Sequence, residues 1–158
     1  MEKIASFTVN HLDLLPGLYV SRRDRIGSET VTTFDMRVTR PNTEPVIETA
    51  ALHAIEHLGA TFLRNDPDWK DKTVYFGPMG CRTGFYFLLR DSVSRMEALR
   101  LVQESFAFIA AFDGEIPGSR REECGNYREH DLPGARDVAA DMGRVLADWL
   151  PEKMEYEA

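Results

Sequence analysis

The residues with the clearest chemical potential are His53, Glu56 and His57, in a segment that reads His-Ala-Ile-Glu-His. Positions i and i+4 of a helix project from one face, so both imidazoles can reach one ion. Glu56 lies at the edge of that face, where it can contact whatever binds the ion without being a ligand. Metal-assisted proton transfer and hydrolysis use such arrangements. The alternative is a solvated face with two histidines that bind nothing, but the motif favours a metal.

The segment around this motif has the pattern of an amphipathic helix. Its apolar residues recur with helical spacing and predict a face packed against a core. They are Ile47, Ala51, Ala54, Ile55, Leu58 and Phe62. Pro45 suits a first helical turn and Thr43 a cap before it, so we expect the helix to begin near Pro45 and to continue through Arg64.

The chain has two cysteines, Cys81 and Cys124. A disulfide is one interpretation, but a reducing compartment argues against it. Cys124 lies in a polar stretch and could supply a third ligand, which leaves a fourth position open, as in catalytic zinc sites. Cys81 lies in Gly77-Pro-Met-Gly-Cys-Arg-Thr-Gly84, a pattern typical of a tight turn that approaches a ligand closely. Arg82 could help to stabilise a Cys81 thiolate.

Composition indicates a compact enzyme. The length of 158 residues predicts one domain over residues 1–158. A net charge of −7 makes a nucleic-acid partner unexpected. The amino-terminal residues carry no apolar run of the length that a signal peptide or membrane span needs, so we expect no membrane partner and a cytoplasmic location. We expect the charged end, residues 152–158, to be frayed.

The remaining pattern predicts an α+β fold, in which a mostly antiparallel four-stranded sheet packs against helices. Alternation predicts strands over residues 18–25, 31–39, 73–76 and 83–89, with Arg37 on the face opposite the apolar one. Ser94 and Glu97 have capping-box spacing at the start of another helix. A polar connection over residues 113–132 carries Cys124 and His130, and a last helix is predicted over residues 134–149.

Several blocks of the chain together resemble the S-ribosylhomocysteine lyase (LuxS) family. They are Ser6-Phe7 with His11, Phe34-Asp-Met-Arg37, His53-Ala-Ile-Glu-His57 with Arg64, Gly77-Pro-Met-Gly-Cys-Arg-Thr-Gly84, and Glu123-Cys-Gly125 with His130-Asp-Leu132. The resemblance implies a homodimer with one divalent ion per chain, iron(II) in the cell and often zinc or cobalt after purification. It also implies cleavage of S-ribosylhomocysteine to homocysteine and 4,5-dihydroxy-2,3-pentanedione, the precursor of the quorum-sensing signal autoinducer-2.

The resemblance and the chemistry assign roles to these residues. His53, His57 and Cys124 would hold the metal. Glu56 would carry protons between the oxygens and carbons of the sugar, and Cys81, as a thiolate, would be the other base. His130 would not bind the metal itself but would support one of its ligands through a hydrogen bond.

Substrate contacts are expected at Ser6, His11, Arg37 and Arg64, the last as a partner for the homocysteine carboxylate. The dimer would place its active sites at the interface, with Ser6, His11 and Arg37 reaching across to the partner's metal. Two alternatives stay open at this point. One is an inverted-zincin metallopeptidase, which also uses His-x-x-Glu-His. The other is a non-catalytic metal-binding module.

Overall fold

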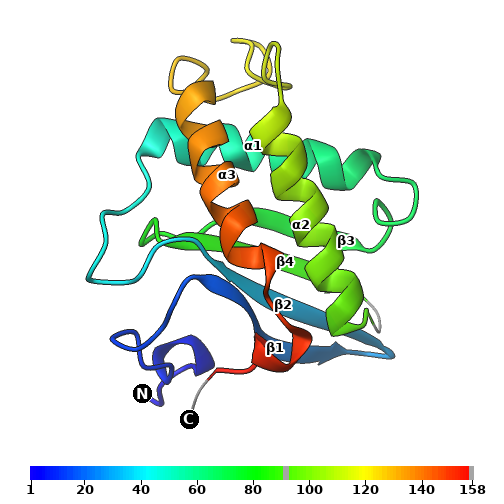
Figure 1. Cartoon of the computed structure of the whole chain (residues 1–158). Coiled ribbons are helices and arrows are strands. Elements are labelled where there is room, and N and C mark those ends of the chain that lie inside the picture. The colour runs from blue at the N-terminus through cyan, green and yellow to red at the C-terminus, as the bar shows by residue number, and fades with distance from the viewer. Residues whose placement is uncertain (91–92, 157–158) are drawn as a thin grey trace.

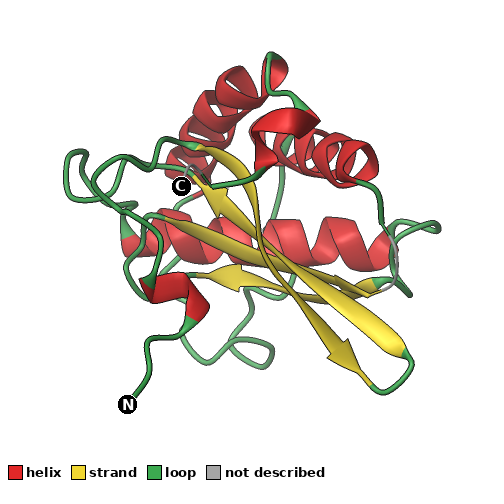
Figure 2. Cartoon of the chain, turned by 90° about the horizontal axis from the view of Figure 1, so that it is seen from below, coloured by secondary structure: helices red, strands yellow, loops and turns green. Residues whose placement is uncertain are grey.

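The structure is a computed structural model that describes residues 1–90 and 93–156 of the chain. The order of its elements is η1 (Ala5–Phe7), β1 (Gly17–Ile26), β2 (Glu29–Arg37), α1 (Thr49–Asn65), β3 (Thr73–Pro78), β4 (Gly84–Arg90), α2 (Arg95–Ala111), α3 (Leu132–Ala147) and η2 (Pro151–Met154). The strands form one antiparallel sheet in the order β1-β2-β4-β3. The three long helices cover one face of it (Figures 1 and 2). The predicted α+β fold is confirmed. Within the described ranges, no helix combines the length and apolarity needed to cross a membrane.

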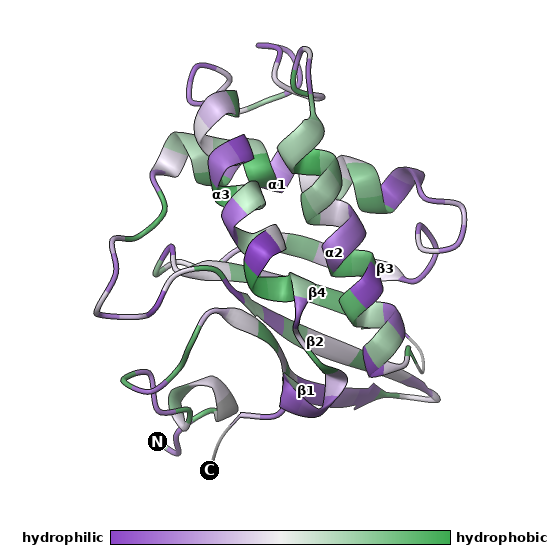
Figure 3. Cartoon of the chain, viewed as in Figure 1, coloured by the Kyte–Doolittle hydropathy of each residue, from purple (hydrophilic) through white to green (hydrophobic). Residues whose placement is uncertain are grey.

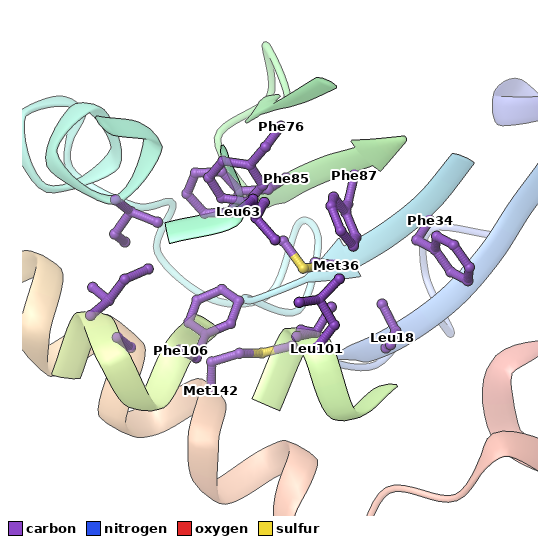
Figure 4. Close-up of a cluster of buried hydrophobic side chains, with 14 of the residues drawn as sticks. Leu18, Phe34, Met36, Leu63, Phe76, Phe85, Phe87, Leu101, Phe106 and Met142 are labelled. Atoms are coloured by element: carbon purple, nitrogen blue, oxygen red, sulfur yellow. The ribbon is translucent and has the colours of Figure 1, made fainter. Parts of the chain in front are cut away.

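The core lies between the sheet and the helices. Strand residues of one face, among them Phe34, Met36, Phe85 and Phe87, meet Leu101, Phe106 and Met142 from the helices (Figure 4). Hydrophilic residues gather on the outward surfaces of the helices and in the loops (Figure 3). The same alternation sends Asp35 and Arg37 to the face without helices, yet each is only 2% exposed. A charged pair buried on that face needs neighbours that replace water.

The helix with the His-x-x-Glu-His motif begins later than predicted. α1 starts at Thr49 with Glu48 as its cap residue, so the expected start near Pro45 is wrong. The reason is a tether, since the Ile47 N–H donates to the carbonyl of Arg82 at 3.0 Å. That bond holds the chain that enters α1 against the β3–β4 turn, which carries Cys81. The capping box at Ser94 of α2 is confirmed, and α3 begins slightly earlier than expected, with Asp131 as its cap.

The end of the chain is packed rather than frayed. Met154 of η2 is fully buried in the core cluster, and the Trp149 indole N–H donates to the carbonyl of Leu18 at 3.0 Å. The Trp149 ring covers Gly17, where a Cβ atom would come within 2.3 Å of it. This end of the chain packs along the outer strand β1 (Figure 1). The predicted fraying is therefore wrong as far as Tyr156, and residues 157–158 lie outside the described part.

Candidate metal centre and thiol site

Four side chains converge on the amino-terminal half of α1. His53 and His57 come from α1, and Cys124 and His130 from the connection between α2 and α3. One ligand atom of each lies within 4.8 Å of all the others. Cys124 Sγ is 3.5 Å from His53 Nε2, 3.9 Å from His57 Nε2 and 3.7 Å from His130 Nε2. The structure thus brings together the residues predicted as ligands.

Backbone carbonyls orient the two helical imidazoles. His53 Nδ1 lies 2.8 Å from the carbonyl of Glu129, and His57 Nδ1 lies 2.9 Å from that of Pro117. Metal-binding histidines usually donate their second ring N–H in this way, which leaves Nε2 free for the ion. Gly118 permits the second contact, because it has φ +72° and a Cβ atom there would be 3.2 Å from His57 Nδ1. Both Nε2 atoms therefore point at the Cys124 sulfur.

His130 belongs to this cluster more closely than its sequence indicated. Its ring stacks on that of His53 with centroids 4.0 Å apart, and its Nδ1 atom is buried without a hydrogen-bond partner among the described residues. Burial, followed by the charges of His53 and His57, lowers the pKa of His130 and favours its neutral form. The sequence signal was only its place six residues after Cys124. Imidazole nitrogens with one thiolate suit zinc, iron(II) or cobalt, so the donor set fits a divalent ion.

Cys81 lies in a second polar cluster, formed where β2 meets β4. Arg37 donates to the Asp35 carboxylate through Nε at 3.1 Å and Nη2 at 2.6 Å. Its Nη1 reaches Thr83 Oγ1 at 2.6 Å and Cys81 Sγ at 3.9 Å. Strand register creates this contact, since Arg37 pairs with Gly84, where a Cβ atom would lie 2.3 Å from the Met36 carbonyl oxygen. Gly84 therefore permits the close approach of β2 beside the Cys81 turn.

The cluster favours a thiolate at Cys81. Burial alone would raise the pKa of the Cys81 thiol, but hydrogen bonds from Thr83 and the Arg37 charge outweigh it, so the pKa is lowered. Burial likewise opposes the charge on Arg37, but Asp35 leaves the pKa of Arg37 raised. The expectation for Arg82 is wrong: Arg37 is the cation beside the thiol, whereas Arg82 Nη1 lies 3.5 Å from the Ile47 carbonyl.

The other predicted site residues lie elsewhere. Glu56 is half-buried on α1, one position before His57. Ser6 lies in η1, and His11 Nδ1 contacts the Val9 carbonyl at 2.9 Å. This amino-terminal segment lies beside β1, across the sheet from α1 (Figures 1 and 2). Arg64 donates to the Val74 carbonyl at 3.0 Å, about 10 Å along α1 from His57. The structure does not bring Ser6, His11 or Arg64 to the ligand cluster of their own chain.

The fold and the two clusters define an α+β protein with a His/Cys metal centre and a separate activated thiol. A family model described as S-ribosylhomocysteinase (LuxS) matches residues 4–153. The chain therefore belongs to the S-ribosylhomocysteinase (LuxS) family.

Relatives that carry the name S-ribosylhomocysteine lyase match over most of their length. The one from Clostridium beijerinckii is 58% identical over 139 residues, which cover 88% of this chain and 87% of that protein. The one from Phocaeicola vulgatus is 54% identical over 157 residues, with 99% and 98% covered. The one from Borreliella afzelii is 46% identical over 156 residues, with 99% of each covered.

Proposed function

We propose that this protein is a metal-dependent S-ribosylhomocysteine lyase that releases homocysteine and 4,5-dihydroxy-2,3-pentanedione. The observation that carries the proposal is the presence of two different cysteine sites in one chain. Cys124 lies among the imidazoles of a ligand cluster, and Cys81 lies 3.9 Å from the Arg37 guanidinium. A metallopeptidase or a structural metal-binding module would use the first cluster but would leave the second without a purpose. Family membership supports the same assignment.

The reaction needs both clusters because the thioether of the substrate has no acidic neighbouring proton. The carbonyl must move from C1 to C3 of the ribose before the C4 proton becomes acidic. Removal of that proton then forms the C4–C5 double bond, breaks the C5–S bond and releases homocysteine, and the remaining enol becomes a ketone. When bound by His53, His57 and Cys124, a divalent ion would supply Lewis-acid polarisation of the sugar oxygens.

The protein's own residues would move the protons. Glu56 lies beside the ligand face of α1 and would carry a proton between sugar oxygens and carbons. Cys81, as a thiolate stabilised by Arg37 and Thr83, would take a proton from carbon and return it. Since a base is usable only in its deprotonated form, the lowered pKa of Cys81 suits this role.

The metal in the cell is proposed to be iron(II), with zinc or cobalt as alternatives, one per chain. Imidazole and thiolate ligands suit all of these ions, so ligand type alone does not select among them. Cys81 and Cys124 are both free thiols, which suits the reducing cytoplasm as the place of action.

The test is incubation of anaerobically purified, iron- or cobalt-loaded protein with S-ribosylhomocysteine, with titration of the free thiol produced. We expect homocysteine to appear in proportion to substrate consumed. Cleavage of a peptide without thiol release would show a peptidase. Neither reaction, in protein with a full metal content, would show a non-catalytic module.

The ligand assignment predicts different effects of four alanine variants on metal content. Replacement of His53, His57 or Cys124 should remove most of the bound cobalt, because two of these are oriented by carbonyls and the third supplies the thiolate. His130→Ala should keep it, since His130 Nδ1 has no such partner in the described structure. Cobalt content and the thiolate-to-cobalt absorption band are the measurements. Loss of metal from His130→Ala would make His130 the fourth ligand.

We further propose a homodimer with active sites at the interface. Apolar side chains of the amino-terminal segment are exposed, with Ile4 at 54%, Phe7 at 70% and Leu12 at 68%. A second copy that covers them would also explain why the amino-terminal segment, which carries Ser6 and His11, lies beside β1 and across the sheet from α1. We expected Arg37 to reach across to the partner's metal, but its side chain contacts Cys81 of its own chain instead.

Mixed dimers test this arrangement. We expect His11→Ala and Glu56→Gln chains to be separately inactive and to regain activity when mixed. In a shared site, the His11→Ala chain supplies Glu56 and the metal while its partner supplies His11, so one site of each mixed dimer is complete. Thiol release after verified subunit exchange is the measurement. An inactive mixture would place His11 and Glu56 of one chain in the same site.

A further inference from the structure

The carboxyl-terminal segment reaches the cluster that holds Cys81. We propose that Tyr156 is a positioning residue for Cys81, because its hydroxyl fixes the Asp35 carboxylate that holds Arg37 against the thiol. The inference rests on the proposed role of Cys81 as a base. It assigns a part in the reaction to a tyrosine that lies outside the metal-ligand cluster.

Tyr156 is held firmly where it meets Asp35. Its hydroxyl donates to Asp35 Oδ2 at 2.8 Å. Its ring stacks on Tyr19 with centroids 5.2 Å apart and an interplanar angle of 17°, and Tyr19 in turn meets Trp149 edge to face at 5.5 Å. Burial, followed by the Asp35 charge, raises the pKa of Tyr156, so the hydroxyl remains a donor at every physiological pH.

Strand register puts these groups in one row. Tyr19 of β1 pairs with Asp35 of β2, and Asp35 pairs with Tyr86 of β4. Their side chains share the face without helices. Tyr156, near the carboxyl end of the chain, packs over two of them, Tyr19 and Asp35. The side chains of Asp35 and Arg37 are each only 3% exposed. Tyr156 therefore takes a place that water would otherwise fill beside a buried ion pair.

The hydroxyl acts through a chain of hydrogen bonds. Asp35 Oδ2 accepts from both Tyr156 and Arg37 Nη2, while Oδ1 accepts from Arg37 Nε. A two-point contact of this kind fixes the plane of the guanidinium. Nη1 is then directed at Thr83 and Cys81. Without the Tyr156 hydroxyl, Arg37 is the one hydrogen-bond partner left to the carboxylate among the described residues. The Asp35–Arg37 pair can then turn together, and Nη1 loses its fixed place near the sulfur.

The experiment compares Tyr156→Phe, which keeps the stacked ring, with Tyr156→Ala, which also opens the cover. Metal-loaded protein is treated with iodoacetamide across a pH series, and the alkylated Cys81 peptide is quantified by mass spectrometry. Neither variant substitutes the groups that face Cys81 in the described structure, which are Arg37, Thr83 and, at longer range, Tyr86. Tyr75→Phe, a half-exposed tyrosine of β3, is the matched control.

We expect the alkylation midpoint of Tyr156→Phe to rise by roughly half a pH unit, which means about threefold less thiolate below the midpoint. Tyr156→Ala should shift further, and kcat should fall in both with KM and metal content unchanged. Tyr75→Phe should match the wild type. A wild-type midpoint in Tyr156→Phe would overturn the inference, whatever the midpoint of Tyr156→Ala, because only the hydroxyl is removed in that variant. Full activity of Cys81→Ala would instead overturn the proposed role of Cys81, so the two failures are distinguishable.

Discussion

Cys81→Ala and Glu56→Gln should each lower kcat/KM by about 10²- to 10⁴-fold, the usual value of a general acid–base group. Both variants should keep a full metal content, because neither side chain belongs to the ligand cluster. The loss follows from chemistry, since each proton transfer in the carbonyl shifts and the elimination needs a carrier at the reacting carbon or oxygen. Thiol release and metal analysis of the same samples measure the two effects.

The role of Cys81 also predicts how activity changes with pH. Cys81 works as a thiolate, and its pKa is lowered from the ordinary value of about 8.5 for a thiol. Activity should therefore fall as the pH drops through that lowered pKa, and the acid limb should move to higher pH in Arg37→Ala. Cys81→Ser is the matched control, because a hydroxyl preserves the contact with Thr83 but is not deprotonated at neutral pH. Near-normal turnover in Cys81→Ala or Glu56→Gln would remove that residue from the mechanism.

Arg37→Ala should be the most destabilising of the charge substitutions, by about 3–5 kcal/mol. The substitution leaves the Asp35 carboxylate buried, since only 2% of the residue is exposed. Among the described residues, Tyr156 is then the hydrogen-bond donor that remains to it. The cost arises from the unpaired charge rather than from the lost attraction. Urea unfolding measures it. Arg100→Ala is the matched control, because its ion pair with Glu104 is exposed and its loss should leave the free energy of unfolding unchanged.

A double variant separates stability from function. Asp35→Leu with Arg37→Met removes both charges, so the unfolding free energy should recover much of the loss seen in Arg37→Ala. Catalysis should not recover, because Cys81 still lacks its cation. If Arg37→Ala unfolds at the same urea concentration as the wild type, Asp35 is not confined as the structure shows.

The metal cluster was partly predictable from sequence because a helix fixes the distance between positions i and i+4. His53 and His57 follow from that spacing alone. His130 could not be placed, because its position depends on how an irregular connection folds back on α1. Those bends are set by contacts such as the Pro117 carbonyl with His57, which no local pattern encodes. The strands and the capping box were predictable for the same reason as the histidines, since their patterns are periodic or short-range.

The cluster around Cys81 was less predictable, because it depends on contacts between residues that are distant in sequence. The sequence indicated a tight turn around Cys81 but pointed to its neighbour Arg82 as the cation. Arg37 lies 44 positions away, and only the β2–β4 register brings it to the sulfur. The late start of α1 has a similar origin, because the Arg82 carbonyl binds the Ile47 N–H that a longer helix would use. Tyr156 was missed because a charged end of the chain carries no sign of the partner it meets.

The connection between α2 and α3 has no regular secondary structure, yet it supplies Cys124 and His130 and is fastened to α1 through Glu129 and Pro117. An ion bound there joins two parts of the chain that are distant in sequence, so it acts as a removable cross-link. Part of the free energy of metal binding then stabilises the ordered conformation of this connection. Amide hydrogens of residues 117–130 should exchange faster after chelation, and proteases should cut there first. The metal would thus also protect this irregular connection from degradation.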